Sequence, residues 1–114
     1  MQIGDILYSY NYNKIEKDFE IIETQYKISD IKDMLKSGNV IVWARQVNNN
    51  TVAKVLKIKD INKVVHGCYV SEVSDFEAAK QAFIDYENAK IEKLEMEMKI
   101  RKERIEKIFY KPHG

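Results

Sequence analysis

The sequence has few of the residues that build disulfide frameworks or interrupt regular structure. It contains one cysteine, one proline and four glycines among 114 residues. A single cysteine excludes an intramolecular disulfide and is typical of a reducing compartment. No uncharged apolar run is long enough to cross a bilayer, and no basic-apolar-small signal opens the chain. We therefore expect a cytoplasmic protein that makes no membrane contact.

The chain also lacks an excess of charge of either sign. Nineteen basic and 18 acidic residues give a formal net charge of +1, so overall charge identifies no class of partner. Apolar residues make up 45% of the chain, which is enough for a folded core. Ile, Lys and Asn are frequent and their codons are A/T-rich, which indicates a low-GC bacterium, or something living in one, as the source.

Motifs of common enzyme classes are missing. The glycines are too far apart in sequence to form a phosphate-binding loop. Neither the serine-hydrolase GxSxG motif nor the zinc-protease HExxH motif occurs. The acidic residues are scattered, without a paired-carboxylate pattern. We therefore expect a non-enzymatic protein with no catalytic residues, no cofactor and no metal.

His66 and Cys68 form the one pair of residues with chemistry to weigh. They stand two positions apart on a predicted strand and would face the same side. The pair could be a nucleophile with its base, or half of a zinc site, for which the other strong candidate ligand is His113. A buried cysteine beside an ordinary strand histidine is the simpler interpretation.

Residues 1–72 have the pattern of a β-rich domain. Tyr8, Tyr10 and Tyr12 alternate with other residues at a period of two, which predicts a strand with one aromatic face. About five strands predict an α+β fold, either a small bent antiparallel sheet or an SH3-like barrel, with one short inserted helix and a long C-terminal helix. The later strands are expected over residues 18–28, 40–47, 51–58 and 64–70.

The short helix is predicted at about residues 30–37. Ser29 can cap its first turn. Ile31 and Met34 begin an apolar stripe, and Gly38 is a natural C-terminal stop.

The long amphipathic helix is predicted over residues 74–110, followed by a flexible tail at 111–114. Ser74 and Glu77 match the Ser-x-x-Glu capping box. Acidic residues crowd its start and basic residues its end, as the helix dipole favours. The helix would be about 54 Å long, longer than a seventy-residue domain is wide.

Apolar residues recur every seven positions along this helix. The helix could fold over the sheet, but its excess length favours docking on a partner or on a second copy. Glu87 and Arg101 interrupt the pattern, so it is short for a coiled coil. The predicted partner or dimer interface consists of Ile91, Leu94, Met98, Arg101, Ile105, Ile108 and Phe109.

Two alternatives to a protein-binding inhibitor or adaptor are a homodimeric structural or assembly protein with no other target and a small nucleic-acid-binding regulator. The tyrosines of the first strand, with Trp43 and Tyr69, could form a stacking platform. Ile6 shares the face of the first-strand tyrosines, which indicates instead that this face is core. The possible phosphate contacts are Arg45, Lys54, Lys57 and Lys59.

Two passages resemble short phage and prophage proteins with an SH3-like domain. The opening Met1–Tyr8, with its Gly-Asp-hydrophobic strand, resembles their first strand. The passage from Tyr69 to Ala79, from a strand into a capped and charged helix, resembles their ending. The resemblance implies an accessory factor that binds and blocks a host protein in the bacterial cytoplasm, as anti-CRISPR and other anti-defence inhibitors do. It implies no active-site residues.

Overall fold

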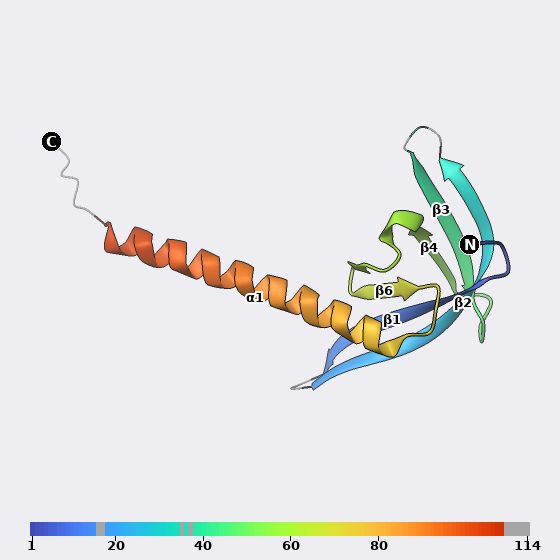
Figure 1. Cartoon of the computed structure of the whole chain (residues 1–114), viewed down its shortest axis with the longest axis horizontal. Helices are drawn as coiled ribbons and strands as arrows, with labels where there is room; N and C mark the ends of the chain where they lie inside the picture. Colours follow the sequence, from blue (N-terminus) through green and yellow to red (C-terminus); the bar gives the residue numbers. More distant parts are fainter. Residues whose placement is uncertain (16–17, 35, 37, 109–114) are drawn as a thin grey trace. The chain divides into compact units, whose positions relative to one another are not determined.

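The computed structural model describes residues 1–15, 18–34, 36 and 38–108, and over these residues six antiparallel strands form one curled sheet that is followed by a long helix (Figure 1). The strand order is β4-β3-β2-β1-β6-β5. The predicted fold class, an α+β protein with a bent antiparallel sheet and a long C-terminal helix, is confirmed. The elements are β1 (Ile6–Ile15), β2 (Asp18–Met34), β3 (Asn39–Gln46), β4 (Ala53–Lys57), the 3-10 helix η1 (Ile58–Asp60), β5 (Val64–Val65), β6 (Cys68–Ser71) and α1 (Phe76–Glu106).

The chain divides into two compact units. The first runs from Met1 to Phe83 and holds the sheet and the first two turns of α1. The second begins at Ile84 and holds the rest of the helix. The sheet unit is therefore completed by helical residues that lie beyond the predicted end of the β-rich domain at residue 72.

Strand β1 is central and is buried on both faces. Leu7 and Ser9 point to one face and Tyr10 to the other, and all three side chains are fully buried. We call these the Leu7 face and the Tyr10 face. The core on the Leu7 face consists of Leu7, Ile28, Val42 and Val70, with Ile31, Leu56 and Cys68 partly buried against it.

The core on the Tyr10 face joins the sheet to the first turns of α1. Tyr10 and Tyr69 are buried there together with Ala79 and Phe83 of the helix. The Phe83 ring stacks on Tyr12 at 4.8 Å between centroids and meets the edge of Tyr69 at 6.5 Å. The tyrosine-bearing face of β1 is therefore core, as the presence of Ile6 on it indicates.

The predicted helix at about residues 30–37 is wrong over the residues that the structure describes there, because β2 continues to Met34. A bulge between Ile28 and Asp30 shifts the register against β3. After the bulge, Ile31 pairs with Val42 and rejoins the face of Ile28. A spacing of three residues, which is helical in an unbroken pattern, here comes from a strand with one extra residue.

The N-cap of the long helix is Asp75, one residue after the predicted Ser74. Asp75 Oδ1 accepts a hydrogen bond from the Ala78 amide at 3.0 Å, the geometry of a capping carboxylate. Ser74 Oγ instead donates to Glu23 Oε2 at 2.9 Å. The capping residue is therefore acidic, which also suits the helix dipole.

The predicted last strand over residues 64–70 is a tight hairpin instead. His66 and Gly67, at its tip, have φ values of 51° and 73°. Positive φ at both central residues is the mark of the two-residue hairpin turns that match strand twist. Glycine adopts such a φ without a steric penalty, so Gly67 suits this position.

Candidate functional site

The segment of α1 from Ile84 onward carries a stripe of exposed apolar side chains. Positions separated by alternating three- and four-residue steps lie on one side of a helix. Each stripe residue is at least 50% exposed. The predicted interface residue Arg101 lies on the same side. We define the apolar stripe as Ile91, Leu94, Met98 and Ile105 of α1 together with Ile108, which lies two residues beyond the end of α1 at Glu106, where the helix stops short of the predicted residue 110.

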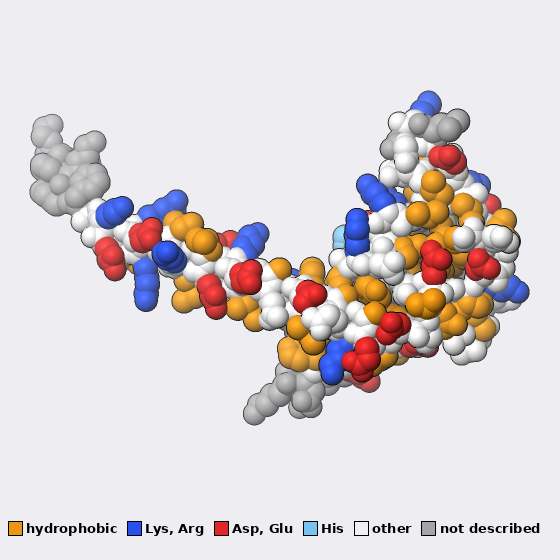
Figure 2. Space-filling view, viewed as in Figure 1, with side chains coloured by type: hydrophobic (Ala, Val, Ile, Leu, Met, Phe, Trp, Pro, Cys, Tyr) orange, Lys and Arg blue, Asp and Glu red, His pale blue; other side chains and the backbone are white. Residues whose placement is uncertain are grey.

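Charged residues border the apolar stripe on both sides. By helical geometry, Glu97 and Arg104 lie along one border, and Glu95 and Lys102 along the other. Figure 2 shows acidic and basic side chains interspersed with apolar ones along this segment. An exposed apolar core with a charged rim is the usual composition of a protein–protein interface.

Met96 lies on the side of the helix opposite the apolar stripe, since it is two residues from both Leu94 and Met98. It is 57% exposed, close to the 65% of Met98. The two methionines therefore report on opposite sides of the same helix at similar starting exposure.

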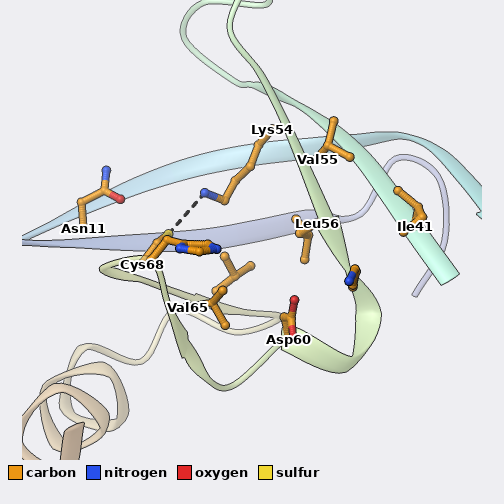
Figure 3. Close-up of a pocket in the computed structure, with 11 residues that line it drawn as sticks. Asn11, Ile41, Lys54, Val55, Leu56, Asp60, Val65 and Cys68 are labelled. Atoms are coloured by element: carbon orange, nitrogen blue, oxygen red, sulfur yellow. Dashed lines mark hydrogen bonds between the residues drawn. The ribbon is translucent and has the colours of Figure 1, made fainter. Parts of the chain in front are cut away.

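A cavity of about 520 Å³ opens on the Leu7 face between β1, β4 and the last hairpin (Figure 3). Lys54 reaches into it, and its Nζ donates to Cys68 Sγ at 3.3 Å. Ser9 Oγ lies 3.0 Å from the same sulfur and shares a hydrogen bond with it. Lys54 Nζ also lies 5.8 Å from the centre of the Tyr26 ring. The Lys54 ammonium thus contacts a thiol and an aromatic face.

His66 and Cys68 both line this cavity, but they do not do so by facing the same side of one strand, as the sequence predicts. The two residues do not share a strand, since His66 is in the hairpin turn and Cys68 begins β6. Among the described residues, no group of three or more His, Cys, Asp or Glu side chains is placed to hold a metal ion. His113 lies outside the described residues.

The candidate phosphate contacts are divided between the two faces of the sheet. Lys54 pairs with Ala44 and points to the Leu7 face. Arg45 is next to Ala44 in β3 and points to the other face, where its Nη1 donates to the Asn50 carbonyl at 2.9 Å. Lys57 lines the same cavity as Lys54, and Lys59 lies in η1.

The aromatic residues weighed as a stacking platform are mostly occupied within the fold. The rings of Tyr10 and Tyr69 are buried in the core that Phe83 completes. Trp43 is half-buried, with the Lys32 ammonium 5.1 Å from its ring centre. The structure therefore does not bring these rings together as an open surface.

A polar network that the sequence gives no sign of ties β1, β2 and the start of α1 together. Tyr10 Oη donates to Glu23 Oε2 at 2.7 Å and accepts from the Asp75 amide at 2.9 Å. Burial raises the pKa of the Tyr10 phenol above its ordinary value of 10.0, and the hydrogen bond to Glu23 acts in the same direction. Glu23 and Asp75 are 13 and 65 positions away from Tyr10 in the sequence, so no local pattern could reveal the network.

Phe109, the last residue of the predicted interface, lies outside the described residues.

In the described part of the chain, no helix combines the length and the apolar character needed to cross a membrane. Comparisons with protein-family models, curated proteins and solved structures found no match to this chain.

Proposed function

We propose that this chain is a non-enzymatic protein-binding module, an inhibitor or adaptor that covers a working surface of a host protein. The observation that carries the proposal is the apolar stripe on α1. Four large apolar side chains share one side of α1, Ile108 follows just beyond its end, and all five are at least half exposed and bordered by charges of both signs. Burying such a stripe against a partner removes apolar area from water and is favourable.

The proposed mechanism is steric. A helix with one mainly apolar side can occupy a groove on another protein and exclude what normally binds there. The resemblance of the chain's opening and of its Tyr69–Ala79 passage to phage accessory proteins supports a phage or mobile-element origin. It also supports a target in the bacterial cytoplasm, with an anti-defence role such as CRISPR inhibition as one form of the activity.

The alternative of a nucleic-acid-binding regulator has less support. Arg45 and Lys54 point to different faces of the sheet, and Tyr10 and Tyr69 are core. A backbone-binding surface needs clustered positive charge, with aromatic rings free to stack.

A nuclease-treated capture experiment tests the proposal. The tagged chain is incubated with lysate of a low-GC bacterium, and retained proteins are identified by mass spectrometry. We expect wild type to retain a specific protein that the Leu94→Asp/Ile105→Asp variant loses. Removing a charged side chain on the apolar stripe from water costs free energy that opposes binding. Met96→Asp, on the opposite side of the helix, is the matched control and keeps the protein.

Circular dichroism verifies that all three chains are folded equally. Equal retention by wild type and the stripe variant contradicts the proposal. Recovery of nucleic acid alone, seen only when nuclease is omitted, favours the alternative.

A further inference from the structure

The apolar stripe is self-complementary when a second copy runs in the opposite direction. We infer that two copies of the chain pair through residues 91–108 as an antiparallel helical pair. The inference rests on the proposed function in that both take the apolar stripe as a protein interface, so a second copy and a host protein would compete for it. In this alignment the facing residues within α1 are Leu94 with Ile105 and Met98 with Arg101, and Ile91 faces Ile108 just beyond the end of α1.

The charges along the borders match in this alignment. In an antiparallel pair, residues on one border of the stripe meet residues on the same border of the second copy. Glu97 then lies near Arg104 of the second copy, and Glu95 near Lys102 of the second copy. Two-fold symmetry repeats each contact, giving four pairs of opposite charge and none of like charge.

Arg101, which interrupts the apolar pattern, also fits this alignment. It faces Met98 rather than another arginine, and its methylene stem can cover the thioether while the guanidinium reaches water. A polar residue at a core position of paired helices specifies register at some cost in affinity.

Other alignments bring like charges together. A parallel pair in register also forms four pairs of opposite charge, Lys90 with Glu95 and Glu97 with Lys102, but it places Arg101 against Arg101 at the centre of the interface. An antiparallel pair moved by one heptad toward the N-terminus places Glu97 against Glu97 and Glu95 against Glu95. Like charges facing one another across an interface are unfavourable and select against the wrong register.

Disulfide trapping distinguishes the orientations. Met98→Cys and Arg101→Cys chains are prepared separately in a Cys68→Ser background, mixed, and oxidised under mild conditions. We expect the mixed disulfide between the two chains as the main product, because the antiparallel alignment places position 98 opposite position 101. Disulfides that link each variant mainly to itself indicate a parallel pair and overturn the inference.

Charge reversal gives a second measurement, by sedimentation over a series of concentrations. Arg104→Glu should weaken self-association about tenfold, since two attractive pairs become repulsive, and Glu97→Arg in the same chain should restore it. Lys90→Glu is the control, because only the parallel alignment uses Lys90.

A wild-type chain that stays at 13.4 kDa throughout the series overturns the dimer. If the stripe variant still loses a captured host protein, the proposed function stands without the dimer.

Discussion

Replacing Phe83 by alanine is expected to lower the free energy of unfolding by about 4 kcal/mol. The Phe83 side chain is 2% exposed and fills the space between α1 and the Tyr10 face. Its removal loses the transfer free energy of the ring and leaves a cavity lined by Tyr12 and Tyr69. The variant also loses the main apolar contact that holds the first turns of α1 on the sheet.

Urea unfolding followed by circular dichroism measures this effect. Phe76→Ala is the matched control, since Phe76 lies in the same two turns but is 49% exposed. Its cost should stay below about 1 kcal/mol, because surface substitutions change little. Equal losses for the two variants would contradict the packing of Phe83 described above.

Replacing Tyr10 by phenylalanine is expected to cost about 2 kcal/mol at neutral pH. The ring is kept, so the core packing changes little. The hydroxyl is lost, however, and the Asp75 amide at the start of α1 loses its acceptor while Glu23 loses a donor. The part-buried Asp75 amide left without its acceptor accounts for most of the expected loss.

The same substitution should also show a pH dependence. Burial raises the pKa of Tyr10 in the folded protein, so the unfolded chain ionises first as the pH increases. The contribution of Tyr10 is therefore fully present below about pH 10 and is lost as the pH rises through the folded pKa. The stability difference between wild type and Tyr10→Phe should shrink above that pH.

Unfolding at a series of pH values, with Tyr8→Phe as the control, checks this expectation. Tyr8 is on the same strand and face but is only half-buried. The stability difference between wild type and Tyr8→Phe should therefore stay the same across the pH series. A difference between wild type and Tyr10→Phe that stays constant above pH 10 would argue against the buried phenol as its source.

Alternation of residue type was sufficient to predict most of the sheet. The aromatic alternation of β1 and the β-branched runs of β3 and β4 placed those strands correctly, because the side-chain period of a strand is two. The long helix was predictable from its charge pattern, its uninterrupted length and its acidic start.

Features that depend on tertiary contacts were not predictable. The bulge at Ser29 converted a strand pattern into an apparent helical one, and only pairing with β3 reveals it. The hairpin turn has His66 before Gly67 in place of the Asn or Asp that usually marks a two-residue turn, so the local turn signal was weak. The contact between Lys54 and Cys68 joins residues on different strands, which no local spacing encodes.

One part of the candidate site was predictable from local sequence, and another part was not. The apolar stripe follows from helical spacing alone, and the structure places its members with at least half of each side chain exposed. The choice between alignments of two copies needs the border charges, which local propensity does not report.

Oxidation of the methionines by hydrogen peroxide, read by mass spectrometry, tests most directly whether a protein covers the apolar stripe. Met98 lies in the stripe and Met96 on the opposite side, at 65% and 57% exposure, so they should oxidise at similar rates in a dilute sample. In a concentrated or partner-bound sample, we expect Met98 to be protected several-fold relative to Met96. An unchanged ratio of the two rates would contradict the account.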